Sequence, residues 1–168
     1  MNLIQSKISR LPIQIKQNSV IINDGALKVL KHCPIFYMGN IGESNKYAHH
    51  IIPTHKSQID CLKYLNPDLY KYGISSDIYR RVIKEHQKNF KSFDLMLLKE
   101  SYRYQEVESI VTKELRHKKR LLKLNWNKRM QREITYFEDE NERQWLIDFI
   151  DELVMERIKQ TDFINIIL

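Results

Sequence analysis

The chain of 168 residues is 42% hydrophobic, contains six Phe, two Trp and nine Tyr, and carries a formal net charge of +7. This composition excludes an intrinsically disordered chain, and four Gly and four Pro are too few for a linker-rich one. Two cysteines make no disulfide framework, no stretch approaches the ~20 apolar residues of a membrane span, and no apolar leader opens the sequence. We therefore expect one folded domain with extensions, in a soluble intracellular protein of the cytoplasm or nucleus that has no membrane partner.

The first half of the chain contains two predicted strands separated by an insertion. Residues 1–32 form an N-terminal extension whose pattern indicates no role. Residues 35–38 are a short apolar run of the kind that forms a buried strand, and residues 69–74 alternate in the manner of a second strand. Residues 43–68 lie between them, and a stretch of this length is usually functional or mobile.

The second half of the chain is predicted to contain helices around one further strand. Ser76 or Asp77 can cap a helix over residues 77–88. Residues 93–98 are apolar on both faces, as in a strand covered on both sides, and residues 103–122 have the periodicity of an amphipathic helix.

The order of these elements predicts an α/β fold with a small three-stranded antiparallel sheet flanked by helices. Residues 33–125 would form this domain, followed by a C-terminal helical extension at residues 126–168. Asp139 and Glu142 resemble a capping pair for a helix in that extension. The predicted buried stripe of this helix consists of Leu146, Phe149, Ile150 and Leu153.

One ordered set of residues lies within the predicted domain. Gly73 is followed after eight residues by Arg81, and Glu108 opens the helical pattern E-x-I-x-x-K-E-L. This order and spacing resemble the GIY-YIG nuclease superfamily, and more closely its divergent viral and phage branch, whose second half-motif reads KxG. Lys71 and Gly73 supply the KxG, and Tyr37 stands for the tyrosine of the first half-motif.

The resemblance implies a metal-dependent DNA endonuclease. In the family one glutamate holds a divalent cation, an arginine stabilises the phosphate and the first tyrosine helps to activate water; the matching residues are Glu108, Arg81 and Tyr37. A hard cation held by one carboxylate and several waters suits Mg²⁺ or Mn²⁺. Lys71 replaces the second tyrosine, so it either serves the phosphate or a neighbouring tyrosine, or marks the loss of the usual chemistry. His86 lies one residue beyond the position where related nucleases often carry a histidine.

A basic block follows the predicted catalytic residues. Residues 113–132 carry nine Lys and Arg against one Glu, whereas residues 133–168 carry three basic against ten acidic residues. Such density predicts a nucleic-acid-binding surface. Its central residues are Lys118, Lys119, Arg120 and Lys123. The alternative is a solvated helix face that the acidic tail partly neutralises.

Three other interpretations stay open. The chain could be a catalytically inactive nucleic-acid-binding module of the same fold. It could instead be an interaction domain, or a homodimer, that uses the acidic C-terminal helix. The insertion could also hold zinc through His50, His55 and Cys61 with the distant Cys33, although no paired-cysteine motif supports such a site.

Overall fold

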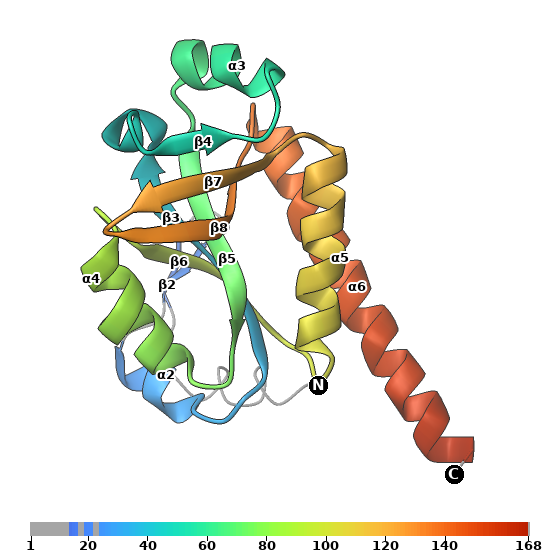
Figure 1. Ribbon diagram of the computed structural model, residues 1–168. Coiled ribbons are helices and arrows are strands. Elements are labelled where there is room, and N and C mark those ends of the chain that lie inside the picture. The colour runs from blue at the N-terminus through green and yellow to red at the C-terminus, as the bar shows by residue number, and fades with distance from the viewer. Residues whose placement is uncertain (1–13, 17–18, 22–23, 168) are drawn as a thin grey trace.

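A six-stranded antiparallel sheet with helices packed on both of its faces forms the body of the protein (Figure 1). The computed structural model describes residues 14–16, 19–21 and 24–167, and the side chains of residues 25 and 27–155. The strands are β1 Gln14–Lys16, β2 Ser19–Ile21, β3 Ile35–Glu43, β4 Ile51–Pro53, β5 Asp68–Ser75, β6 Asp94–Glu100, β7 Leu121–Trp126 and β8 Arg129–Tyr136. The helices are α2 Asp24–Val29, the 3-10 helix η1 Ser44–Tyr47, α3 Ser57–Leu65, the π-helix η2 Arg80–His86, α4 Gln87–Asn89, α5 Tyr104–His117 and α6 Glu140–Ile167.

The predicted three-stranded sheet is wrong, because the sheet has six strands in the order β4-β7-β8-β5-β3-β6. The three predicted strands are present as neighbours, with β3 antiparallel to both β5 and β6. The strand β4, from the insertion, and the hairpin of β7 and β8 extend this core to one side. The strands β1 and β2 form a separate two-stranded sheet.

The helix predicted at residues 103–122 ends early, and this is the physical source of the error. Helix α5 stops at His117, and Lys119 takes a left-handed conformation with φ of 59° before the chain enters β7. Leu122 and Leu124 then alternate inward, which is the period of a strand. Pairing with β8, which follows β7 after the turn at Asn127 and Lys128, decides the outcome for these residues.

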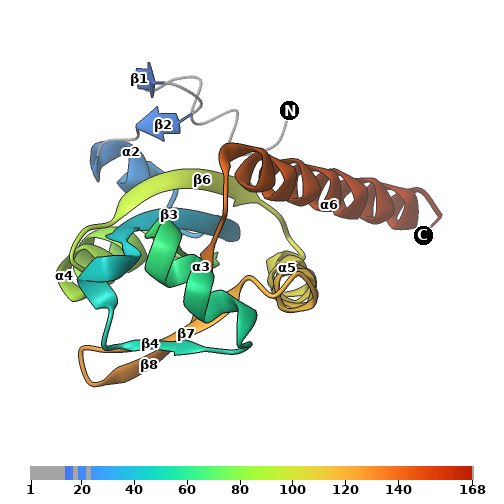
Figure 2. The same cartoon turned by 90° about the horizontal axis from the view of Figure 1, so that it is seen from above.

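Two apolar cores lie on the two faces of the sheet. One contains residues of α2 and η2, such as Leu27 and Val82, together with residues of β3 and β8. The other contains Val107 and Val111 of α5 together with Leu146 of α6. Figures 1 and 2 show α5 and α6 on the opposite side of the sheet from η2 and α4. Both faces of the sheet are therefore covered by helices.

The C-terminal helix α6 belongs to the packed body over its first half. Asp139 caps it as predicted, since its Oδ1 accepts a hydrogen bond of 2.8 Å from the Glu142 N–H. The predicted stripe is buried at Leu146, Ile150 and Leu153 and half-buried at Phe149. These side chains pack inside the chain, so this stripe of α6 is covered by the protein itself. None of the described helices is both long and apolar enough to cross a bilayer.

The pairing of β5 leaves part of that strand open. Strand β8 pairs with β5 only from Leu69 to Lys71, and among the described residues no strand lies beyond Lys71 on that side. Helix η2 follows the end of β5, and α5 contacts the strand through a 2.8 Å hydrogen bond between Tyr72 Oη and Thr112 Oγ1. The open part of β5 therefore lies between these two helices (Figure 1).

Candidate active site

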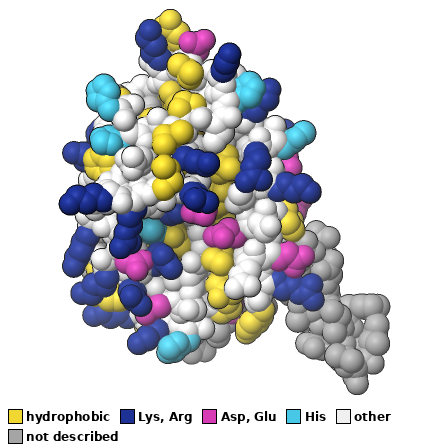
Figure 3. Space-filling view, viewed as in Figure 1, with side chains coloured by type: hydrophobic (Ala, Val, Ile, Leu, Met, Phe, Trp, Pro, Cys, Tyr) yellow, Lys and Arg dark blue, Asp and Glu magenta, His cyan; other side chains and the backbone are white. Residues whose placement is uncertain are grey.

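The open part of β5 is the place where the predicted catalytic residues meet. Tyr37 comes from β3, Lys71 from β5, Arg81 from η2 and Glu108 from α5. The charges of Lys71 and Arg81 both lower the pKa of Glu108, and those of Arg81 and Glu108 both act on the pKa of Tyr37. Because charge–charge interactions weaken with distance, and because β3 and β5 are paired, these four residues belong to one region of the fold. Figure 3 shows acidic and basic side chains side by side over this part of the sheet.

The glycine of the motif has a direct steric role. A Cβ on Gly73 would lie 2.9 Å from Tyr37 Oη and 3.2 Å from Tyr37 Cζ. Residues 37 and 73 face each other across β3 and β5, so only a residue without a side chain leaves room for the phenol.

Lys71 is paired with a carboxylate that the sequence did not indicate. Its ammonium lies 2.8 Å from Glu133 Oε2, with side-chain exposures of 8% for Lys71 and 36% for Glu133. Glu133 and Arg132 both lie opposite Lys123 where the register shifts between Leu122 and Leu124, which is a β-bulge. A bulge can redirect a side chain beside a functional site, and no sequence pattern marks this one.

Opposing effects act on the pKa of Glu133. Burial alone would raise it, but the Lys71 ammonium, its hydrogen bond and the charge of Arg132 together hold it below its ordinary value. The ion pair therefore stabilises the fold above the pKa that this carboxyl has in the unfolded chain. Acidification through the lowered folded pKa removes that stabilisation.

The buried ion pair of Lys71 and Glu133 should contribute more to stability than an exposed pair, and two Glu→Gln substitutions compare them. Glu133→Gln should lower the free energy of unfolding by about 1 to 3 kcal/mol at pH 7, because it leaves a buried ammonium without its counter-charge. Glu85→Gln breaks the exposed pair with Arg81 and should cost less than about 1 kcal/mol. Urea unfolding of both variants gives the comparison, and equal losses would contradict the assigned role of the buried pair.

Glu108 has an environment that suits a metal-binding carboxylate. Burial raises its pKa, the negative charge of Glu133 adds to that rise, and Lys71 and Arg81 oppose it. The side chain is only half-buried, so solvent reaches it. Glu133, the acidic neighbour whose charge acts on Glu108, is itself bound to the Lys71 ammonium, so Glu108 is the carboxylate left for a hard divalent cation that keeps several waters.

Arg81 is exposed and held loosely. Its Nη1 lies 3.2 Å from Glu85 Oε2, one turn further along η2, and its side chain is 42% exposed. An exposed pair of this kind contributes little to stability and is readily exchanged for another anion. Arg81 can therefore turn toward a phosphate at the open edge of β5 without a large energetic cost.

Tyr37 lies beneath the charged residues and does not reach the surface. Its side chain is 2% exposed, and its hydroxyl shares a hydrogen bond of 2.6 Å with His86 Nε2. Burial raises the pKa of Tyr37, while burial and the charges of Lys71 and Arg81 lower the pKa of His86 to about 3. Both groups are neutral near pH 7. The expectation that Tyr37 activates a water molecule therefore has no support from its position, whereas His86 gains a defined partner.

The predicted nucleic-acid-binding residues lie on different elements. Lys118 and Lys119 follow α5, and Lys118 Nζ lies 4.7 Å from the centroid of the Trp145 ring. Arg120 forms a bidentate pair with Glu142 and lies 2.9 Å from Glu138, so its charge is neutralised. Lys123 is exposed on β7.

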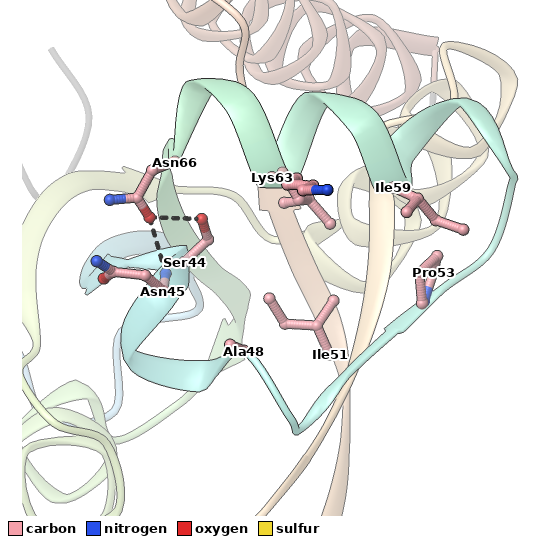
Figure 4. A pocket seen from close by; sticks show the side chains of 9 residues that line it. Ser44, Asn45, Ala48, Ile51, Pro53, Ile59, Lys63 and Asn66 are labelled. Carbon is pink, nitrogen blue, oxygen red and sulfur yellow. Dashed lines mark hydrogen bonds between the residues drawn. The ribbon is translucent and has the colours of Figure 1, made fainter.

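The insertion contains a pocket that is separate from this site. It has a volume of about 480 Å³, lies between η1, β4 and α3, and contains none of the four predicted catalytic residues (Figure 4). Most of its lining is apolar, as at Ile51 and Leu62. Asn66 closes one end, where its Oδ1 accepts hydrogen bonds from Ser44 Oγ at 3.0 Å and from the Asn45 N–H at 2.8 Å.

The zinc interpretation of the insertion is not supported. His50 Nδ1 is 3.0 Å from the Asn125 carbonyl oxygen, and His55 Nδ1 is 2.7 Å from Ser57 Oγ. In the described part of the chain, no three His, Cys, Asp or Glu side chains come together as a set of metal ligands.

Comparisons with models of protein families, with curated proteins and with solved structures gave no match. The likeness to GIY-YIG nucleases therefore depends on the motif residues of the sequence alone.

Proposed function

We propose that the protein is a metal-dependent endonuclease that hydrolyses DNA phosphodiester bonds. The observation that supports this most is that the charges of Lys71 and Arg81 both act on Glu108 in the region where β5 is left unpaired by β8. Phosphodiester hydrolysis needs positive charge on the phosphate and a carboxylate for a metal, and these are the groups that meet there.

Each residue of the proposed site has a separate role. Arg81, being exposed, contacts the phosphate, and its planar guanidinium suits two phosphate oxygens. Lys71 adds positive charge from below and is kept in place by Glu133. Tyr37 and His86 form a neutral, buried hydrogen-bonded pair that holds η2 against β3.

Glu108 would hold Mg²⁺ or Mn²⁺, since Glu133 is bound to the Lys71 ammonium. Such an ion, when bound, polarises the phosphoryl oxygens and lowers the pKa of a coordinated water. The raised pKa of Glu108 makes a proton compete with the metal, so metal-dependent activity should fall as the pH is lowered.

A second candidate function has one observation in its favour. Lys71 and Arg81 are both paired with carboxylates, and the Tyr37 hydroxyl is buried. A chain with this arrangement could bind nucleic acid through its basic surface without cleaving it. Cleavage assays separate this binding module from the endonuclease.

The proposed function is tested by two neighbouring arginines on η2. Arg81→Ala should reduce nicking of supercoiled plasmid in Mg²⁺ or Mn²⁺ by about 10²-fold or more, because it removes charge stabilisation at the phosphate. Arg80 is exposed on the same helix but is not part of the converging set. Arg80→Ala removes the same charge and should leave the rate within about threefold of the parent.

The parent protein provides the decisive control. Nicking should require Mg²⁺ or Mn²⁺ and stop in EDTA. Purified parent protein without activity on duplex, branched or single-stranded DNA in either metal would favour the binding module. Equal losses in the two arginine variants would show that Arg81 has no special role.

A further inference from the structure

The basic block of residues 113–132 is divided by the fold into two separate surfaces. One part follows α5, and the other lies at the turn between β7 and β8. The six residues of β7 separate them by about 20 Å, at ~3.3 Å per residue. Figure 1 shows the end of α5 and the tip of the β7–β8 hairpin at opposite ends of β7.

The part that follows α5 is directed toward the acidic helix α6. Lys118 lies over the Trp145 ring, and Arg120 is bound by Glu138 and Glu142. Lys119 forms no ion pair with the described side chains, but its carbonyl oxygen accepts a hydrogen bond of 2.9 Å from Gln58 Nε2. This part of the block therefore joins α5, β7 and α6, and its positive charge is partly neutralised within the protein.

The tip of the hairpin is attached to α4. Trp126 Nε1 donates a 2.5 Å hydrogen bond to the Asn89 carbonyl oxygen, and Asn127 Nδ2 lies 3.3 Å from Asn89 Oδ1. These contacts bring four exposed cations together, and we call them the hairpin-tip surface. It consists of Lys88, Lys91, Lys128 and Arg129.

The hairpin-tip surface is exposed, and Lys91 Nζ lies 5.5 Å from the centroid of the Trp126 ring. No ion pair among the residues whose side chains are described includes any of its four members. Figure 3 shows Lys and Arg side chains gathered on this side of the molecule, over the hairpin tip and α4. Unneutralised cations on packed elements attract a polyanion and lose little entropy in holding it.

Helix η2 runs directly into α4 and so connects Arg81 to the hairpin-tip surface along the chain. Lys84 is exposed on η2 between Arg81 and the hairpin-tip surface. Positive side chains thus follow η2 and α4 from the site to the hairpin. A nucleic acid backbone lying along this path would present one phosphate to Arg81 while its neighbours meet the lysines.

We propose that the hairpin-tip surface binds the phosphate backbone of double-stranded DNA and places it across the open part of β5. The inference depends on the proposed function for the identity of the site but concerns a different surface. Proteins that hold single strands generally provide aromatic platforms for stacked bases. Among the described residues the strongly exposed aromatic side chains are Tyr64 and Tyr102, which lie on α3 and before α5, whereas Trp126 is half-buried and hydrogen-bonded. The surface therefore suits a duplex backbone.

Two triple variants with the same loss of charge test this surface. Lys88→Gln/Lys128→Gln/Arg129→Gln alters the hairpin tip, and Lys113→Gln/Lys118→Gln/Lys119→Gln alters the end of α5. Each set includes one lysine with positive φ, at 62° for Lys128 and 59° for Lys119, so the backbone context is matched. Binding to a fluorescent 25-base-pair duplex is measured by anisotropy in EDTA over a series of salt concentrations.

The hairpin-tip variant should bind at least tenfold more weakly and show a salt dependence smaller by about two to three phosphate contacts. The α5-end variant should lose clearly less than the hairpin-tip variant, because Lys118 lies over Trp145 of the acidic helix α6. Equal losses, a larger loss at the α5 end, tighter parent binding to single-stranded DNA or RNA, or a parent that does not bind duplex would each overturn the proposal.

Cleavage at saturating DNA separates this inference from the proposed function. If the parent binds through the hairpin tip but nicks no DNA, the surface stands and the endonuclease does not. If Arg81→Ala loses nicking while the hairpin-tip variant binds normally, the endonuclease stands and the surface is wrong.

Discussion

Replacing Glu108 by Gln should abolish metal-dependent cleavage, with a loss of about 10³-fold or more. The amide keeps the size of the side chain but removes the negative charge that would hold the cation. Metal-ion stabilisation of a phosphoryl transition state is worth several kcal/mol, and each 1.4 kcal/mol is about tenfold in rate. Plasmid nicking in Mg²⁺ and in Mn²⁺ measures the loss, and duplex binding in EDTA should be unchanged because phosphate contacts are a separate contribution.

The same substitution should make the protein more stable. Burial and the charge of Glu133 raise the pKa of Glu108 in the folded state, so the folded chain binds this proton more tightly than the unfolded chain does. The stabilisation is present at low pH and is lost as the pH rises through the raised pKa. At pH 7 the ionised carboxylate therefore opposes folding, and Glu108→Gln should raise the Tm.

A matched control lies on the same helix. Glu114 is half-buried on α5 but is not among the charges that act on the converging residues. Glu114→Gln should keep both nicking and the Tm close to those of the parent. A Glu108→Gln protein that lost stability, or that kept its activity, would remove the metal role from this carboxylate.

Much of the site was visible in the sequence because it depends on local patterns. The spacing of Gly73, Arg81 and Glu108 placed them on a strand, a helix start and the next helix, and the structure has them there. The pairing of β3 with β5 was also predicted, and it brings Tyr37 opposite Gly73.

The features that were missed all depend on pairing with residues outside the pattern from which each was predicted. Leu121 and Leu122 fit the end of a helical pattern, and only the partner strand β8 makes them a strand. Glu133 is directed to Lys71 by a bulge in β8, and Arg120 is neutralised by a helix that begins 20 residues later. The charge of a segment can be counted in a sequence, but which of its charges remain unpaired depends on the fold.

The buried pair of Tyr37 and His86 predicts that the protein loses stability in mild acid. Burial, followed by the positive charges of Lys71 and Arg81, lowers the pKa of His86 to about 3, against about 6.5 for an exposed histidine. His86 therefore binds a proton near pH 6.5 in the unfolded chain but stays neutral there in the folded chain. Stability should fall as the pH decreases from about 6.5, by up to about 1.4 kcal/mol for each pH unit.

Two other titrations must be separated from that of His86. The pair of Lys71 and Glu133 loses its stabilisation only at lower pH, below the ordinary range of a carboxyl group. Glu108 has the opposite sign, since burial and the charge of Glu133 raise its pKa and its protonation therefore stabilises the folded state. The measurement is therefore best made in the Glu108→Gln background between pH 6.5 and pH 5, where His86 accounts for most of the change.

His86→Gln in that background tests the assignment. Glutamine can still hydrogen-bond to the Tyr37 hydroxyl but takes up no proton, so the variant should be somewhat less stable at pH 7 and much less sensitive to acid. Its free energy of unfolding, from urea titrations at each pH, should then change little between pH 6.5 and pH 5. If the slope with pH is the same in both proteins, another group carries the acid sensitivity. Tyr37→Phe removes the hydrogen bond to His86 but leaves its buried position and the neighbouring charges of Lys71 and Arg81 unchanged. This variant should therefore keep the dependence of the free energy of unfolding on pH.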